Sequence, residues 1–231
     1  MHAALLLLTD GRLPSGAHAH SGGLEQAAVD GRVRSVEDVG LFARGVLEGA
    51  GSTAAALAAT ACALASAPAA RGETPPWDLL CAEAWARQPS AAARHASEAQ
   101  GRALLRTGRR VWPGTLLETL AAGSLRPPLP VVLGAVAAAA GLSPRDAALA
   151  SLHGQVSGVA SAAVRLLGLD PIEVAAALAT LTPTLDRLAH DAAACATTDP
   201  GRLRLLPATT GPLLDVLAER HDAREMTLFA S

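Results

Sequence analysis

The apolar residues of this chain recur mainly at the three- and four-residue spacings of helices. In the segment after Ser35, for example, Val39, Phe42 and Val46 fall on one helical face, which should therefore be buried. Strands would show alternating β-branched and aromatic residues, but the chain has no Tyr and a single Ile. The pattern therefore predicts an all-α protein.

Capping residues and prolines mark the predicted helix boundaries. Ser21 is placed to cap a short helix, and Ser35 with Asp38 forms a capping-box-like start. Ser143 and Asp170 each precede a proline at the first helical position. These signals predict a single-domain helical bundle of about eight to ten helices over residues 1–231. The predicted segments are about 21–32, a long helix from 35, 77–87, 90–110, 113–122, 129–140, 143–167, 171–195 and 212–224.

The composition indicates how the core is filled and which chemistries are excluded. Half of the residues are hydrophobic but 2% are aromatic, so we expect Ala, Leu and Val to fill the core and small side chains to let helices approach closely. All 19 basic residues are Arg, and the absence of Lys excludes a Walker A phosphate loop and Schiff-base chemistry. A formal net charge of −2 gives no general attraction to nucleic acid.

Cysteine usage and the start of the chain indicate a cytoplasmic protein. Cys62, Cys81 and Cys195 are far apart and form no CxxC pair, which predicts buried thiols in a reducing compartment. No basic residue precedes the short apolar run at the start, so we expect no signal peptide. Residues 50–67 carry little charge, but they are mostly Ala, Thr and Ser rather than the Leu and Ile of a membrane span.

One stretch, LPSGAHAHSGGLE at residues 13–25, concentrates candidate chemistry. A strand-like apolar run precedes it and a helix start follows, as in phosphate loops, but its glycines fit neither GxGxxG nor a Lys-bearing pattern. His18 and His20 are candidate nickel or zinc ligands, although no third ligand stands beside them. Ser21 next to His20 lacks the GxSxG context of a hydrolase. We therefore predict no catalytic residue and no cofactor, and favour ordinary hydrogen-bonded histidines over a metal site.

Four arginines, Arg102, Arg106, Arg109 and Arg110, form a stripe at helical spacing. Glu98 lies four residues before Arg102, which favours a solvated face with an internal ion pair. Nucleic acid is the less favoured partner because no interleaved aromatic residue is present to stack on bases. The stripe is equally suited to an acidic protein surface.

Short motifs along nearly the whole chain resemble the urease accessory protein UreF family. Each is weak alone, but their order and separations together are specific. The motifs are LPSGA at 13–17, SGGLE at 21–25, AQGR at 99–102 with LLR at 104–106, LPVVLG at 129–134, AAVRL at 162–166 and LFAS at 228–231. A Met, a Leu and a Phe near the C-terminus also predict a docked tail, on the chain's own core or on a partner.

The resemblance implies non-enzymatic work in the cytoplasm. UreF-like proteins form dimers, bind the accessory protein UreD or UreH, and recruit the GTPase UreG onto the urease apoprotein for nickel insertion. Such a scaffold would use the N-terminal loop and the C-terminal tail as docking segments. The alternative is a helical nickel carrier that uses His18 and His20. The candidate interface residues are Pro14, Gly16, Ser21, Gly22, Gly23, Glu25, Arg102, Arg165, Leu228 and Phe229.

Overall fold

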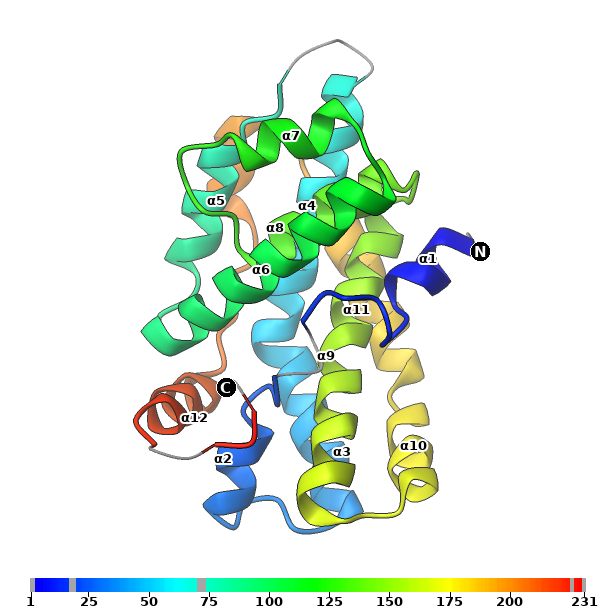
Figure 1. Cartoon of the computed structure of the whole chain (residues 1–231), viewed down its shortest axis with the longest axis vertical. Helices are drawn as coiled ribbons and strands as arrows, with labels where there is room; N and C mark the ends of the chain where they lie inside the picture. Colours follow the sequence, from blue (N-terminus) through cyan, green and yellow to red (C-terminus); the bar gives the residue numbers. More distant parts are fainter. Residues whose placement is uncertain (1–2, 17–19, 70–73, 225–226, 230–231) are drawn as a thin grey trace.

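The computed structural model describes residues 3–16, 20–69, 74–224 and 227–229. The regular elements in these ranges are twelve α-helices, one π-helical segment and one 3-10 segment, with no strand. The all-α prediction is therefore confirmed, whereas the predicted number of helices is too low. Figure 1 shows α4 and α9 running along the long axis, α6 and α7 lying obliquely across it, and α12 with the C-terminal segment beside α2.

The helices follow one another with short connections. In the first half they are α1 (Ala3–Leu8), α2 (Leu24–Val29), α3 (Val36–Val46), the π segment η2 (Leu47–Gly51), α4 (Ser52–Ala69), α5 (Trp77–Ala86) and α6 (Ala91–Val111). In the second half they are α7 (Thr115–Ala121), α8 (Leu129–Ala139), α9 (Pro144–Leu167), α10 (Pro171–Ala179), α11 (Thr182–Cys195), the 3-10 segment η3 (Pro200–Leu205) and α12 (Pro212–Asp222).

The number of helices exceeds the nine predicted segments for three local reasons. The long helix predicted from 35 is divided by η2 into α3 and α4. The apolar run at the start, interpreted as strand-like, forms the helix α1. The predicted helix over 171–195 is divided at Thr180 and Leu181, and Pro183 stands in the first turn of α11, where its missing N–H costs no hydrogen bond.

Three of the four predicted caps are found where the sequence placed them. Ser35 and Asp38 form a capping box at α3, and Ser143 forms one with Asp146 at α9. The carboxylate of Asp170 accepts a hydrogen bond from the Ile172 N–H at the start of α10. These short-range signals identify helix starts because cap and helix lie within one turn of each other.

Helix α4 runs through the centre of the molecule, where it packs against α8, α9 and α11. The approach to α8 is so close that a Cβ atom on Gly134 would overlap the carbonyl oxygen of Ala58. Small residues allow this spacing, as the composition predicts. Residues of α4 and α9 contribute to two hydrophobic clusters. The upper cluster lies under α5 to α8, and the lower hydrophobic cluster is enclosed by α2, α3, α10, α11 and α12.

The run from α3 through η2 into α4 is a long apolar helical segment. By length and composition it is the one helix in the described residues that meets the criteria for a membrane span, yet 67% of its most apolar window is buried inside the fold. Gly49 breaks the helix with ψ of −120°, and the chain at Thr210 and Gly211 packs against this kink. The segment is therefore a kinked core helix.

Candidate functional site

The first half of the N-terminal loop is anchored to α6. Leu13 is buried in the upper cluster, and the carbonyl of Pro14 accepts a hydrogen bond of 2.6 Å from the Thr107 hydroxyl. Gly16 has a φ of 79° and lies against Ala103, where a Cβ would come within 3.5 Å of that side chain. Pro14 itself is exposed, so this part of the loop is attached to α6 through its backbone.

The second half of the loop makes a left-handed turn into α2. Gly22 and Gly23 have φ angles of 61° and 87°, which side-chain-bearing residues rarely adopt. Ser21 was expected to be the cap of this helix. The N-cap position is instead occupied by Gly23, while the fully buried Ser21 hydroxyl accepts a hydrogen bond of 3.3 Å from the Glu25 N–H.

Glu25, in the first turn of α2, joins the two ends of the chain. Its side chain is buried. Its carboxylate accepts hydrogen bonds of 2.9 Å from the Leu228 N–H, 3.0 Å from the Phe229 N–H and 3.0 Å from Nε2 of His221. The Arg224 guanidinium lies 3.8 Å away. Both oxygens of this buried carboxylate therefore accept a hydrogen bond from the tail backbone.

The electrostatics of Glu25 follow from this arrangement. Burial is the largest single influence and by itself raises the pKa of the carboxyl group. The hydrogen bonds from Leu228, His221 and Phe229 together outweigh it, so the pKa of Glu25 lies below its ordinary value. The carboxylate is thus ionised near neutral pH, the form that accepts all three hydrogen bonds.

The C-terminal tail uses its two apolar side chains in opposite ways. Phe229 is 5% exposed and belongs to the lower hydrophobic cluster, so the tail docks on the chain's own core. Arg165 lies on α9 with its guanidinium carbon 4.5 Å from the centre of the Phe229 ring, a cation–π contact. Leu228 is 73% exposed. We refer to Glu25, Arg165, His221, Leu228 and Phe229 as the tail junction.

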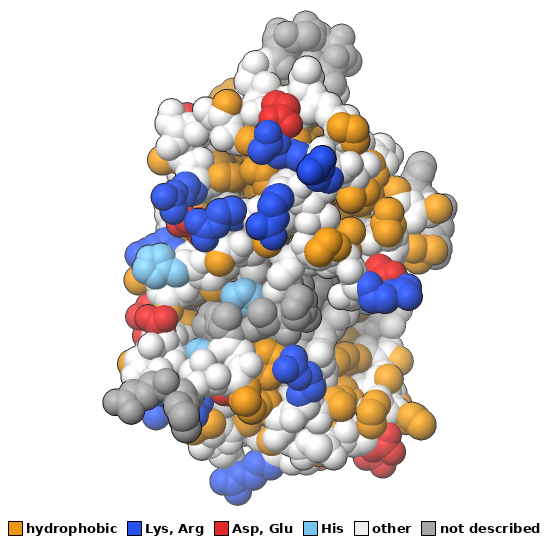
Figure 2. Space-filling model, viewed as in Figure 1, with side chains coloured by type: hydrophobic (Ala, Val, Ile, Leu, Met, Phe, Trp, Pro, Cys, Tyr) orange, Lys and Arg blue, Asp and Glu red, His pale blue; other side chains and the backbone are white. Residues whose placement is uncertain are grey.

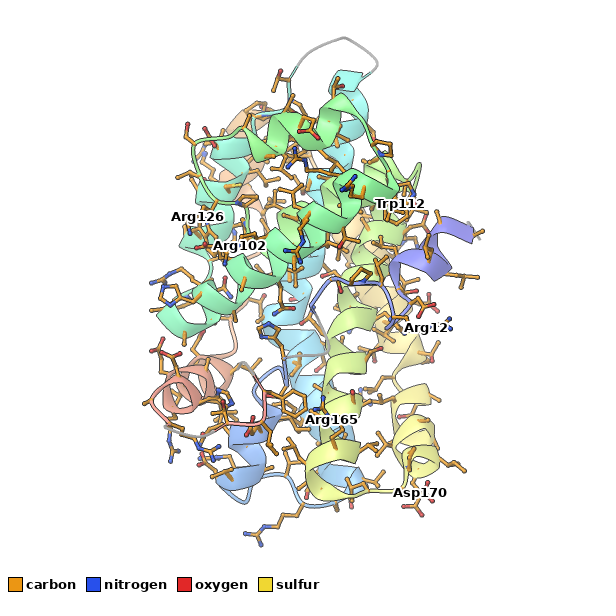
Figure 3. All side chains as sticks on the ribbon, in the orientation of Figure 1. Arg12, Arg102, Trp112, Arg126, Arg165 and Asp170 are labelled. Atoms are coloured by element: carbon orange, nitrogen blue, oxygen red, sulfur yellow. The ribbon has the colours of Figure 1, made fainter. Side chains whose placement is uncertain are left out.

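The sequence-predicted interface residues fall into two places. Ser21 and Glu25 lie with Arg165 and the tail, whereas Arg102 is separate, on α6 (Figure 3). Pro14 and Gly16, which precede α2 in the sequence, lie against α6. The two described parts of the loop thus lie in different places, with Pro14 against α6 and Glu25 at the tail.

The metal hypothesis receives no support from the described part of the chain. His18 lies outside the described residues, and His20 is half-buried. No group of three or more potential metal ligands occurs among the residues that the structure describes. Burial raises the pKa of the Cys62 and Cys81 thiols to about 12. Cys195 is exposed, contrary to the expectation that all the thiols are buried, because it is on the outer side of the last turn of α11.

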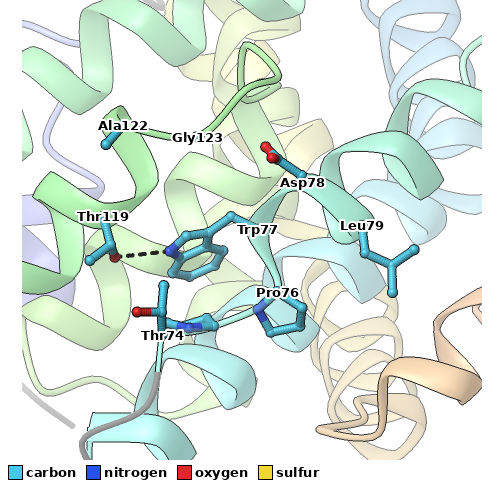
Figure 4. Close-up of a pocket in the computed structure, with 9 residues that line it drawn as sticks. Thr74, Pro76, Trp77, Asp78, Leu79, Thr119, Ala122 and Gly123 are labelled. Carbon is cyan, nitrogen blue, oxygen red and sulfur yellow. Dashed lines mark hydrogen bonds between the residues drawn. The ribbon is translucent and has the colours of Figure 1, made fainter.

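One surface depression in the described part of the chain has no catalytic character. It lies between the start of α5 and the end of α7, and Figure 4 shows the Trp77 indole donating a hydrogen bond of 3.1 Å to the Thr119 hydroxyl. Asp78 is the acidic residue there. Its carboxylate accepts hydrogen bonds from the Leu125 and Ser124 N–H groups, which hold the pKa of Asp78 below its ordinary value. This carboxylate therefore stabilises the loop before α8.

Sequence reasoning missed two residues that hold the loop and tail in place. In the sequence His221 is an isolated histidine in a helical segment, and its partner Glu25 is 196 positions away. Thr107 sits within the arginine stripe, and its partner Pro14 is 93 positions away. No local sequence signal marks such long-range pairs, although Glu25 and Pro14 both lie in the motif-bearing loop at residues 13–25.

Comparisons with known proteins identify relatives over nearly the full chain. The sequence model of the family UreF matches residues 33–182. A protein of Mycobacterium sp. (strain JLS), named urease accessory protein UreF, is 44% identical over 98% of this chain and 97% of its own length. Proteins of the same name from Mycolicibacterium vanbaalenii and Mycobacterium tuberculosis are 43% and 41% identical, each over 99% of this chain and 98% of its own length.

Proposed function

The chain belongs to the UreF family of urease accessory proteins, and from this premise we propose that it is a non-catalytic scaffold of urease maturation. In this proposal it binds the UreD/UreH accessory protein and recruits or regulates the GTPase UreG. The assembly then inserts nickel into the urease apoprotein in the cytoplasm. The chain acts as a single domain and as a homodimer, without nucleic acid or membrane.

The tail junction supports the proposal that the loop and the tail form a docking site. It joins the SGGLE motif to the LFAS motif through the hydrogen bonds of Glu25. Anchoring by Phe229 leaves the adjacent Leu228 with 73% of its surface exposed. An exposed Leu held on a fixed backbone loses little conformational entropy when a partner covers it. The junction thus presents a preformed apolar contact.

Co-expression with UreD/UreH, UreG and the urease apoprotein tests this function. The co-purified complex is analysed by size-exclusion chromatography with light scattering. We expect a stable complex with two copies of this chain, and we expect Leu228→Asp to weaken it. Leu205→Asp is the matched control, because Leu205 is 65% exposed on η3.

The outcomes separate the scaffold from the nickel-carrier alternative. A complex weakened by Leu228→Asp and not by Leu205→Asp supports the scaffold and its docking site. A lone monomer that ignores every partner, yet binds nickel in titration and loses it on combined His18→Ala and His20→Ala replacement, supports the carrier. Deleting the whole tail is a less specific test, since it also removes two of the hydrogen-bond donors to the buried Glu25.

A further inference from the structure

Helix α6 presents an arginine-rich face to solvent. Arg102, Arg106, Arg109 and Arg110 are all exposed, and Arg126 from the connection between α7 and α8 reaches the same Glu98 that pairs with Arg102. Figure 2 shows the basic side chains as a band across the upper half of this face, along α6. We refer to these five residues as the arginine surface.

The opposite side of α6 fixes the direction of this face. A Cβ atom on Gly101 would come within 2.7 Å of the Pro127 carbonyl oxygen, and one on Gly108 within 2.6 Å of Val136. Both glycines therefore let α6 approach α8 and the connection before it closely. Because rotation of α6 would move side chains into these contacts, the arginines are held on the outside.

The arginine surface is only partly neutralised. Glu98 pairs with Arg126 at 2.6 Å and with Arg102 at 3.5 Å, and Glu118 pairs with Arg109. Within the described part of the chain, Arg106 and Arg110 form no ion pair. The five guanidinium groups and two carboxylates leave an excess of three positive charges, on a chain whose formal net charge is −2.

Helix stability does not account for this arrangement. Cations in the last turn of a helix interact favourably with its dipole, which explains Arg109 and Arg110. Arg102 and Arg106 lie earlier, however, and the pairs Arg102–Arg106 and Arg106–Arg110 place like charges four residues apart, where they repel. The unpaired charge is therefore a cost to the isolated protein that a bound anion would remove.

We propose that the arginine surface docks an acidic segment of a protein partner. Guanidinium groups bind carboxylates in a planar two-pronged geometry. Val111 and Leu125, each next in sequence to an arginine of the surface, are 42% and 39% exposed. Arginine beside exposed apolar side chains is typical of protein interfaces, whereas a polyanion as long as a nucleic acid would also meet the net negative remainder of the chain.

The N-terminal loop lies beside this surface, which connects it with the proposed scaffold function. Thr107, between Arg106 and Arg109 in the sequence, donates the hydrogen bond to Pro14, and a Cβ atom on Gly16 would come within 3.5 Å of the Ala103 side chain. A partner that binds the loop can therefore also contact the arginine surface, because both lie along α6. The inference rests on the proposed function for the identity of the partners used in the test.

Charge reversal tests the proposal with a matched control. The variant combines Arg106→Glu with Arg110→Glu, and the control combines Arg34→Glu with Arg202→Glu, two exposed arginines outside the surface. Both variants change the net charge equally. Binding of the full chain to UreD/UreH, UreG and the urease apoprotein is measured by biolayer interferometry at low and high salt. A labelled poly-glutamate peptide and a single-stranded DNA oligonucleotide serve as direct probes.

The expected result is a loss of about tenfold in affinity for one partner and for the peptide at low salt, with little change in the control. Wild-type affinity should fall with salt, and that of the variant should fall less. Equal binding by variant and control to every partner and to the peptide would overturn the proposal, and so would tighter arginine-dependent binding of the DNA. If the wild-type chain binds no partner, the proposed scaffold function is wrong. Binding of the poly-glutamate peptide then tests the arginine surface by itself.

Discussion

The tail junction and the arginine surface both depend on charge, but the two regions are built in opposite ways. At the tail junction one buried carboxylate gathers donors from residues about 200 positions away in the sequence, with separations of 196, 203 and 204. At the arginine surface, four of the five charges come from a single helix and all five face solvent. The tail junction has its carboxylate inside the protein, whereas the arginine surface exposes its charges to solvent.

This difference separates stability from recognition. Removing a buried, hydrogen-bonded charge leaves its partners unsatisfied, so it destabilises the fold. Removing an exposed charge changes stability little, because water and salt already screen it, but it alters long-range attraction to a partner. The tail junction should therefore respond to mutation through unfolding, and the arginine surface through binding.

The largest expected effect is that of Glu25→Ala. The substitution leaves the Leu228 and Phe229 N–H groups and the His221 ring without their acceptor. We expect a loss of about 3 kcal/mol in the free energy of unfolding, measured by urea denaturation followed by circular dichroism. Glu37→Ala, which removes an exposed carboxylate in the first turn of α3, should cost about 0.5 kcal/mol. Equal costs would show that Glu25 does not hold the tail.

Acid should reproduce this effect in the unmodified protein. Because the pKa of Glu25 is lowered in the folded state, its contribution to stability is complete above the pKa of an unfolded Glu and is lost as pH falls through the folded value. The stability difference between wild type and Glu25→Gln should therefore shrink as pH falls below about 4.5. A difference that stays constant down to acid unfolding would contradict the role assigned to the ionised carboxylate.

Gly101→Ala should have the next largest effect. It changes the packed side of α6, opposite the arginine surface. The new methyl group would meet the Pro127 carbonyl oxygen and the Leu129 backbone nitrogen, neither of which is free to move aside. We expect a loss of about 2 kcal/mol in the free energy of unfolding. Gly154→Ala on α9 is the control, since nothing lies within 4 Å of its Cβ, and it should stabilise by about 0.5 kcal/mol. Equal behaviour of both variants would contradict the close packing of α6.

The sequence predicts the features that depend on neighbours along the chain. Helix class, the caps at Ser35, Ser143 and Asp170, and the apolar face of α3 all arise within a few residues. The kink at Gly49 escapes prediction because it depends on packing against residues near 210. The N-cap at Gly23 escapes prediction because the backbone conformation of the turn decides that Ser21, two positions before the N-cap, accepts its hydrogen bond from Glu25.

The candidate site shows the same limit. The motifs single out Glu25, Arg165 and Phe229 one by one, but their meeting depends on how α2, α9 and the tail pack. The guanidinium carbon of Arg165 lies 4.5 Å from the centre of the Phe229 ring. A single exposed arginine in an apolar helix carries no signal for an aromatic partner 64 positions later, so only the fold reveals this contact.

Arg165→Gln should have a smaller effect, confined to the tail. The substitution removes the cation above the Phe229 ring while Glu25 still holds the tail backbone. We expect a loss of about 0.5 to 1 kcal/mol in stability and faster hydrogen exchange in the peptide that contains Thr227 to Phe229. Arg187→Gln, which breaks an exposed ion pair on α11, should leave exchange in the tail unchanged. Unaltered exchange in Arg165→Gln would remove Arg165 from the tail junction.

The double substitution Arg106→Gln with Arg110→Gln should change stability least. It tests directly whether the arginine surface contributes to the stability of the fold. Two repulsive pairs along α6 disappear, while the favourable interaction of Arg110 with the helix dipole is lost. The opposing terms should leave the free energy of unfolding within about 0.5 kcal/mol of wild type at low salt, with the difference vanishing at high salt. Urea denaturation at two salt concentrations measures both. A loss above about 1.5 kcal/mol would mean that these guanidinium groups hold the fold together, and the separation of a stabilising tail junction from a recognising arginine surface would fail.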